Sequence, residues 1–160
     1  GHRSQVIAAG GSAGGLLMGV LANEAPEKYL AVIARVPFVD VVTTMSDAGI
    51  PLTVGEYDEW GNPALAEYFR YMLSYSPYDQ VRRQDYPNML VTASLYDSQV
   101  QYFEPVKWVS RIRKLKTDNN ALLLRVNMAA GHTGASGRYE RYRDVAFEYA
   151  FILGLMDKAR

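Results

Sequence analysis

The feature that most constrains this chain is a short apolar run that ends in small residues and passes directly into a helical pattern. Residues 5–9 (QVIAA) have the composition of a buried strand, and residues 10–15 read GGSAGG. From residue 13 to 25, apolar side chains recur at helical spacing. Residues 29–36 (YLAVIARV) have the composition of a second buried strand, which Pro37 ends. A strand, a tight turn, a helix and a strand in this order predict a βαβ unit and therefore a parallel sheet.

Later segments continue this alternation of strands and helices. Residues 39–62 are less regular and include an acidic and aromatic stretch at 55–61 (GEYDEWG), and an irregular stretch of this length commonly carries a function. We find no repeat, low-complexity segment or linker, so we expect residues 1–160 to form one α/β unit. The further segments expected are helices at 64–73, 105–115 and 141–156, and strands at 89–94 and 122–126.

Composition narrows the class of protein. The chain has 160 residues, of which 49% are hydrophobic and 21% charged, as in a globular domain with a sizeable core. Its 17 basic and 17 acidic residues cancel, which argues against a nucleic-acid or membrane-surface partner. Cysteine is absent, so disulfides and a cysteine nucleophile are excluded. We expect a cytoplasmic location, and a periplasmic one is also compatible with the sequence.

Ser12 lies in the turn between the first strand and the helix, with glycines on either side. A serine in the pattern G-x-S-x-G at such a turn is typical of a nucleophile elbow, because only very small neighbours permit so tight a turn. The turn lifts the hydroxyl clear of the sheet at the helix N-terminus, where the N–H of Ala13 faces an oxyanion. By itself the motif also fits a structural glycine turn or a phosphate-binding loop.

A serine nucleophile needs a general base, and the base needs an acid that fixes its tautomer. Of the two histidines, we expect His2 to be a surface residue without a catalytic role. His132 follows the last strand in a glycine-flanked loop, and Asp97 follows the preceding strand. The order Ser12, Asp97, His132 on successive strand ends is that of α/β hydrolases. We predict a catalytic triad that attacks a carbonyl group, and this mechanism needs no metal or cofactor.

Several motifs resemble the prolyl oligopeptidase family of serine peptidases: GGSAGGLL at 10–17, VPFVD at 36–40 and YSPYD at 75–79. Others narrow the resemblance to the oligopeptidase B branch of that family: LTVGE at 52–56, EWGNP at 59–63, DSQVQY at 97–102, AGH at 130–132 and GASGRY at 134–139. The resemblance covers essentially the whole chain. It implies an α/β-hydrolase fold and the cleavage of short peptides on the C-terminal side of Arg or Lys.

The resemblance also implies a binding site for the basic side chain of the substrate. Glu56 stands where prolyl-specific relatives carry an aromatic residue, and a carboxylate in a partly dry pocket pairs strongly with a guanidinium. Asp58 would add a second negative charge. Phe38 and Trp60 would form apolar walls for the alkyl stem, with Val100 near the triad. Taken without the resemblance, the acidic stretch reads more readily as a solvated loop.

A further position argues against proline specificity. Prolyl-cleaving relatives carry an arginine two residues after the triad aspartate, whereas this chain has Gln99 there. Two alternatives remain open: an esterase or acylaminoacyl peptidase, which would share the triad without needing Glu56, and a non-catalytic hydrolase-like domain, which would be expected to lose a triad member.

The nucleophile follows the first recognisable strand, whereas the family has further hydrolase strands and a β-propeller before it. We therefore expect the C-terminal portion of an α/β-hydrolase catalytic domain, a mostly parallel sheet flanked by helices that lacks the upstream strands and the propeller. The missing N-terminal propeller and hydrolase segment of the same protein would be its partners. We expect the isolated chain to have little or no peptidase activity, because one oxyanion donor and part of the substrate cleft would be absent.

Overall fold

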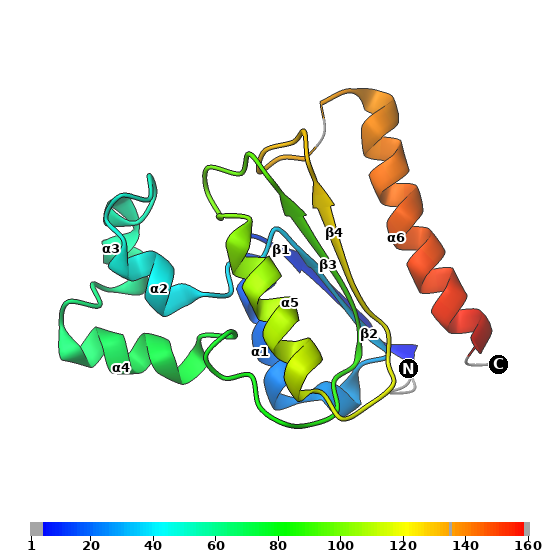
Figure 1. Cartoon of the computed structure of the whole chain (residues 1–160), viewed down its shortest axis with the longest axis horizontal. Helices are drawn as coiled ribbons and strands as arrows, with labels where there is room; N and C mark the ends of the chain where they lie inside the picture. The colour runs from blue at the N-terminus through cyan, green and yellow to red at the C-terminus, as the bar shows by residue number, and fades with distance from the viewer. Residues whose placement is uncertain (1–4, 135, 159–160) are drawn as a thin grey trace.

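The computed structural model describes residues 5–134 and 136–158, so His2 lies outside the described residues. Its centre is a sheet of four parallel strands in the order β1-β2-β3-β4 (Figure 1). The order along the sheet is therefore the order along the chain, and each crossover places its strand beside the previous one. The strands are β1 (Ile7–Gly11), β2 (Ala31–Arg35), β3 (Asn88–Ser94) and β4 (Leu122–Asn127).

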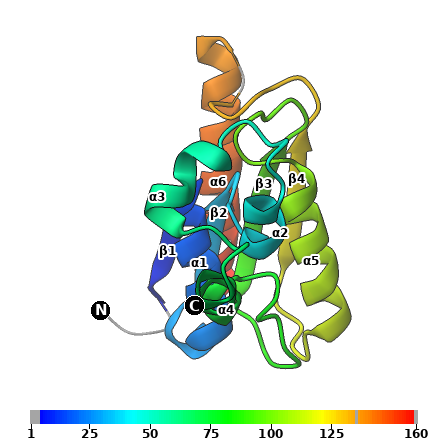
Figure 2. The same ribbon diagram turned by 90° about the vertical axis from the view of Figure 1, so that its left-hand side faces the viewer.

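Helices cover both faces of the sheet. Helices α1 (Ala13–Glu24) and α5 (Phe103–Leu115) lie on one face, and α6 (Arg138–Lys158) lies on the other (Figures 1 and 2). A short 3-10 helix, η2 (Pro26–Lys28), connects α1 to β2. No helix in the described part of the chain is long and apolar enough to cross a membrane.

The core fills the space between the sheet and helices α1 and α5. Because both faces of an inner parallel strand are covered, β2 is buried along Ala31–Ala34 and reads as a continuous apolar run. The buried side chains of this core are Met18, Ala22, Val32, Ala34, Val39, Val81, Tyr86, Met89, Val91, Trp108, Val109 and Ile112.

The segment between β2 and β3 forms a smaller helical lobe beside α1. It contains α2 (Val41–Ser46), η3 (Val54–Glu56), α3 (Tyr57–Trp60) and α4 (Ala66–Tyr75). A second apolar cluster holds the lobe against α1 and the loop after β3, and its buried members are Leu16, Phe38, Val41, Met45, Met72 and Val100. The lobe therefore lies directly beside the turn that carries Ser12.

The expected α/β architecture is confirmed, and every strand and helix predicted from the sequence is present within a few residues. The strand expected at 5–9 was placed too early, since β1 continues through Gly10 and Gly11 up to the turn. Residues 39–62 were expected to be irregular, yet they contain three short helical elements. Short helices with few apolar positions leave little periodic signal, and tertiary packing stabilises them.

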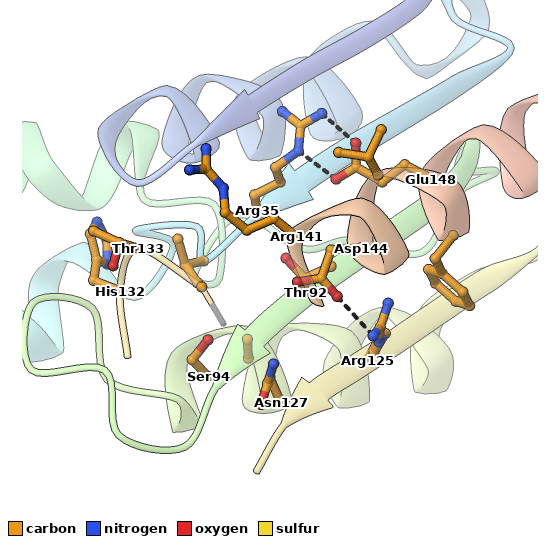
Figure 3. Close-up of a pocket in the computed structure, with 15 residues that line it drawn as sticks. Arg35, Thr92, Ser94, Arg125, Asn127, His132, Thr133, Arg141, Asp144 and Glu148 are labelled. Carbon is orange, nitrogen blue, oxygen red and sulfur yellow. Dashed lines mark hydrogen bonds and ion pairs between the residues drawn. The ribbon is translucent and has the colours of Figure 1, made fainter. Parts of the chain in front are cut away.

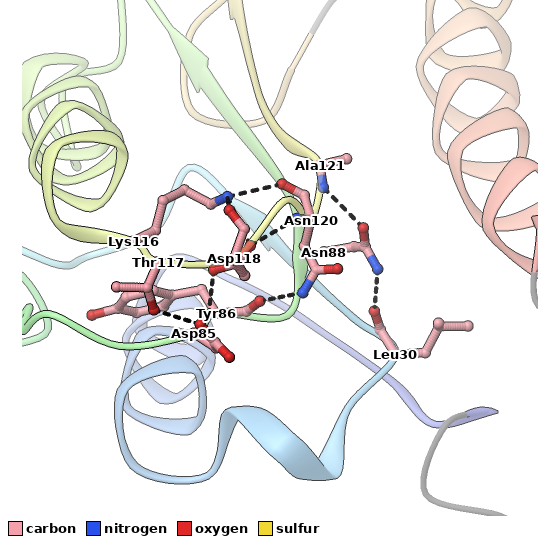
Figure 4. A network of polar contacts seen from close by, with 9 residues as sticks. All are labelled: Leu30, Asp85, Tyr86, Asn88, Lys116, Thr117, Asp118, Asn120 and Ala121. Atoms are coloured by element: carbon pink, nitrogen blue, oxygen red, sulfur yellow. Dashed lines mark hydrogen bonds and ion pairs between the residues drawn. The ribbon is translucent and has the colours of Figure 1, made fainter.

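A polar network lies at the amino ends of β3 and β4, which is the end of the sheet away from the Ser12 turn (Figure 4). The carboxylate of Asp118 accepts hydrogen bonds from the backbone N–H of Tyr86 at 2.7 Å and of Asn120 at 2.8 Å, and Lys116 Nζ lies 2.7 Å from it. Burial by itself raises the pKa of Asp118, but the hydrogen bonds from Lys116, Tyr86 and Asn120 hold that pKa below its ordinary value. The ionised carboxylate therefore ties the α5–β4 connection to the start of β3.

We predict that Asp118→Ala weakens this end of the sheet by about 1–3 kcal/mol, because backbone donors lose their acceptor. Hydrogen exchange of residues 85–89 and 117–121 in the intact protein measures the effect. Because the folded-state pKa is lowered, the stabilisation is present above the ordinary carboxyl pKa of 3.8 and is lost as the pH falls through the lowered value. The difference in hydrogen-exchange protection between Asp118→Ala and wild type should therefore shrink as the pH falls through the lowered pKa of Asp118. A difference that stays constant over this pH range would contradict the prediction.

Candidate active site

Ser12 lies at the sharp turn between β1 and α1. Its backbone has φ 54° and ψ −123°, a conformation that non-glycine residues rarely adopt. The turn brings neighbouring backbones very close: a Cβ on Gly10 would lie 2.5 Å from the carbonyl oxygen of Gly14, and one on Gly15 would lie 2.5 Å from Pro37 Cα. The glycines at these two positions are therefore required by the geometry of the turn.

The structure brings Ser12, His132 and Asp97 together from three loops at the carboxyl ends of the strands. His132 Nε2 lies 3.1 Å from Ser12 Oγ, and His132 Nδ1 lies 2.8 Å from Asp97 Oδ2. Parallel strands place their carboxyl ends at one edge of the sheet, so residues far apart in the sequence meet there. This arrangement can pass a proton from a serine hydroxyl to an imidazole that a carboxylate orients.

The Asp97 carboxylate is held in place from its other side. Its Oδ1 accepts hydrogen bonds from the backbone N–H groups of Gln99 and Val100, both at 2.9 Å. The side chain is fully buried, whereas that of His132 keeps 16% of its surface exposed. The carboxylate is therefore fixed in direction, and the imidazole retains access to solvent.

Ala13 is the first residue of α1 and is exposed. Its backbone N–H donates no hydrogen bond to any described residue, as expected for the first turn of a helix. It follows Ser12 directly, so an unpaired donor at the positive end of the helix dipole lies next to the serine hydroxyl.

A cavity of about 130 Å³ opens beside Ser12 and Ala13. Four of the residues expected to bind substrate line it: Phe38, Glu56, Trp60 and Val100. The indole Nε1 of Trp60 donates to Glu56 Oε2 at 2.7 Å, and the rings of Phe38 and Trp60 pack edge to face at 5.4 Å. One carboxylate thus lies among aromatic and aliphatic walls, in a cavity that Ser12 also lines.

The structure does not bring Asp58 to this cavity. Asp58 is exposed in α3 and is absent from the residues that line the cavity. Residues two apart along a helical segment point in different directions, so Glu56, the N-cap of α3, and Asp58 within α3 do not face the same space. The expected second charge therefore lies outside the cavity.

Sequence reasoning missed part of the lining, which comes from α2 and the loop after it. The residues of α2 carry no recognisable motif, and their only signal is the apolar i, i+4 spacing of Val41 and Met45. Leu52 and Thr53 lie in the LTVGE motif, but the motif does not indicate where their side chains point. The missed lining residues are Thr44, Met45, Ile50, Leu52 and Thr53, together with Gln99 from the Asp97 loop.

A larger cavity, of about 340 Å³, lies on the other face of the sheet, between β2–β4 and α6 (Figure 3). Four of its charged side chains form ion pairs: Arg35 Nε lies 2.5 Å from Glu148, and Arg125 lies 2.8 Å from Asp144. Arg141 and the triad histidine, His132, also line it. These ion pairs join α6 to the sheet. The smaller cavity, which opens at Ser12 and Ala13 and has Glu56 in its lining, is the stronger candidate for substrate binding.

Comparison with known proteins agrees with this geometry. The family model described as "Prolyl oligopeptidase family" matches residues 2–159. The chain is 56% identical to dipeptidyl aminopeptidase BI of Pseudoxanthomonas mexicana and 55% identical to protease 2 of Moraxella lacunata; each match covers 94% of this chain. It covers 21% and 22% of those two relatives, so it spans about a fifth of their length.

Solved structures give the same result. Oligopeptidase B from Leishmania major superposes with a TM-score of 0.95 at 50% identity, and the match covers 97% of this chain and 22% of that one. Oligopeptidase B from Trypanosoma brucei, solved with covalently bound antipain, superposes with a TM-score of 0.94 at 49% identity and with the same coverage of both chains. On the matched sequence, the shared fold and the strand-end positions of its serine, histidine and aspartate, this chain belongs to the prolyl oligopeptidase family.

Proposed function

We propose that this chain carries the catalytic centre of a serine oligopeptidase that cleaves short peptides after Arg or Lys. The observation that supports the proposal most directly is the cavity beside Ser12, where Glu56 is the carboxylate among apolar walls. Such a site suits a long cationic side chain, because its alkyl stem packs on the walls while its charge meets the carboxylate. An esterase or an acylaminoacyl peptidase would have no use for this charge.

In the proposed mechanism, Ser12 Oγ attacks the peptide carbonyl carbon while His132 Nε2 accepts the hydroxyl proton. Asp97 orients the imidazole and stabilises the imidazolium. The Ala13 N–H donates to the oxyanion. His132 then gives the proton to the leaving amine as the C–N bond breaks, which leaves an acyl group on Ser12. A water molecule, deprotonated by His132, hydrolyses that ester and restores the enzyme.

We further propose that these residues act within a longer polypeptide, since the relatives are about five times as long as this chain. In this proposal the upstream part supplies the second oxyanion donor and the remaining wall of the substrate cleft. The N–H of Ala13 alone would stabilise the oxyanion incompletely, because removing one donor from such a site costs roughly 100- to 1,000-fold in rate.

The proposed nucleophile is tested by labelling the full-length protein with a fluorophosphonate probe. We expect one label on Ser12, and no label in Ser12→Ala. Turnover of an Arg-containing peptide should fall about a million-fold in Ser12→Ala and His132→Ala, and about ten-thousand-fold in Asp97→Asn. Unchanged labelling of Ser12→Ala, or wild-type turnover in His132→Ala, would contradict the proposal.

The proposed specificity is tested with two substrates that differ only at the residue before the scissile bond, Arg in one and its neutral isostere citrulline in the other. Glu56→Gln should lower kcat/KM for the Arg substrate by about 100-fold and leave the citrulline substrate nearly unchanged, because a charge-assisted hydrogen bond is lost. Asp58→Asn is the matched control, two residues away and outside the cavity, and it should keep the preference for Arg. Equal losses on both substrates in Glu56→Gln would reject the specificity role.

The same substrates should be offered with a blocked and with a free N-terminus, since one relative is named a dipeptidyl aminopeptidase. An oligopeptidase that cleaves within the chain hydrolyses both. Cleavage restricted to a free N-terminal dipeptide would instead favour an aminopeptidase.

Purified residues 1–160 should cleave the Arg substrate at least about 100-fold more slowly than the full-length protein, because the second oxyanion donor is proposed to come from the upstream part. Full activity of this chain alone, abolished by Ser12→Ala, would show that the upstream part is dispensable for catalysis.

A further inference from the structure

Glu104, the second residue of α5, is fully buried. Burying a carboxylate costs free energy unless hydrogen bonds compensate for the lost water, so its partners indicate what it does. It belongs to neither the triad nor the cavity wall, and no motif in the sequence marks it.

The carboxylate of Glu104 is satisfied entirely by one segment of the helical lobe. Oε2 accepts hydrogen bonds from the backbone N–H of Val39 at 3.1 Å and of Asp40 at 3.0 Å, and Oε1 accepts one from Thr44 Oγ1 at 2.6 Å. Burial raises the pKa of Glu104 to about 7, against these three hydrogen bonds, which lower it.

These contacts continue into the cavity. Val39 follows Phe38, a cavity wall, and Thr44 is itself part of the lining. The carbonyl oxygen of Thr44 accepts a hydrogen bond from Thr53 Oγ1 at 2.9 Å, and the carbonyl oxygen of Thr53 accepts one from the N–H of Glu56 at 3.2 Å. A line of hydrogen bonds therefore runs from Glu104 through Thr44 and Thr53 to the carboxylate-bearing residue of the cavity.

On its other side Glu104 belongs to the segment that carries the triad aspartate. The N–H of Glu104 donates to the carbonyl oxygen of Gln101 at 3.0 Å, at the junction between the Asp97 loop and α5. Val100 of this loop donates its N–H to Asp97 and also lines the cavity. Glu104 thus connects the loop of the proposed acid to the segment that shapes the cavity.

We propose that Glu104 is a positioning residue for substrate specificity, which holds the Phe38 and Thr44 walls and the Glu56 carboxylate at a fixed place relative to Ser12. The inference rests on the proposed function, since it concerns the cavity assigned to the basic side chain. Glu104 does not touch the substrate. It acts through the backbone and the hydroxyl that it binds.

Two substitutions of Glu104 distinguish the effect of its hydrogen bonds from the effect of its side-chain volume. Glu104→Gln can keep all three contacts, because its carbonyl oxygen can accept from both backbone N–H groups while its amide donates to Thr44 Oγ1. Glu104→Leu fills a similar volume but leaves three buried donors without an acceptor. Thr44→Val replaces the hydroxyl that donates to Glu104 with a methyl group of similar size. This milder substitution breaks the first hydrogen bond of the same series, and it tests the proposal if Glu104→Leu does not fold.

Asp118→Asn is the control for general stability. Like Glu104, Asp118 accepts two backbone N–H groups, but it lies at the opposite end of the sheet. All variants are made in the full-length protein and assayed at pH 8 for kcat and KM on the Arg and citrulline substrates. The rate of fluorophosphonate labelling reports the state of Ser12 without using the cavity for a basic side chain.

We expect Glu104→Leu to raise KM for the Arg substrate about tenfold or more, with kcat and the labelling rate within about threefold of wild type. Thr44→Val should give a smaller rise, and Glu104→Gln and Asp118→Asn should stay within about threefold of the wild-type KM. Three results would each overturn the proposal. The first is an unchanged KM in both Glu104→Leu and Thr44→Val. The second is an equal loss of activity on both substrates together with slower labelling, and the third is a Glu104→Gln variant as impaired as Glu104→Leu.

The two proposals fail differently. If the wild-type protein prefers a residue other than Arg or Lys, the proposed function is wrong, and the Glu104 variants are then compared on the preferred substrate. A selective rise in KM on that substrate supports the positioning role, and the absence of such a rise rejects it.

Discussion

The arrangement of the site depends on the backbone of Ser12. Its N–H donates to the carbonyl oxygen of Arg35 at 3.0 Å, and its own carbonyl oxygen accepts from Gly15 at 2.9 Å and from Phe38 at 3.1 Å. Ser12 is therefore hydrogen-bonded to the end of β2, to the first turn of α1 and to Phe38, one of the apolar walls of the cavity. A backbone held from three sides can persist in the rarely adopted conformation seen at Ser12, because the surrounding structure fixes it.

Backbone N–H groups also hold two buried carboxylates in and beside the site. Each of two buried carboxylates takes two backbone N–H groups and one further polar partner: Asp97 takes those of Gln99 and Val100 with the His132 ring, and Glu104 takes those of Val39 and Asp40 with the Thr44 hydroxyl. Backbone donors point in directions that side-chain rotation cannot change. Carboxylates bound to them are therefore held more rigidly than surface charges, as their proposed roles in catalysis and specificity require.

Much of the fold could be predicted because β1, β2, β3 and β4 are short apolar runs between turn signals, and a buried parallel strand needs such a run. Gly10 and Gly15 marked the turn because larger side chains cannot fit there. The small helices α2 and α3 escaped prediction, since four to six residues give little periodic signal and packing in the apolar cluster with α1 and α4 stabilises them. Glu104 escaped as well, because it preceded the helix expected at 105–115 and because a glutamate ordinarily faces water.

The sequence by itself determined the βαβ order, the turn with Ser12, and the positions of Asp97 and His132 after successive strands, because these depend on local pattern and chain order. Only the tertiary structure decided which acidic residue of the 55–61 stretch faces the cavity, selecting Glu56 and leaving Asp58 exposed. It alone placed Thr44, Thr53 and Glu104 in one line of hydrogen bonds. The physical reason is that side-chain direction and long-range hydrogen bonding follow from packing between segments far apart in the chain, which a local pattern does not encode.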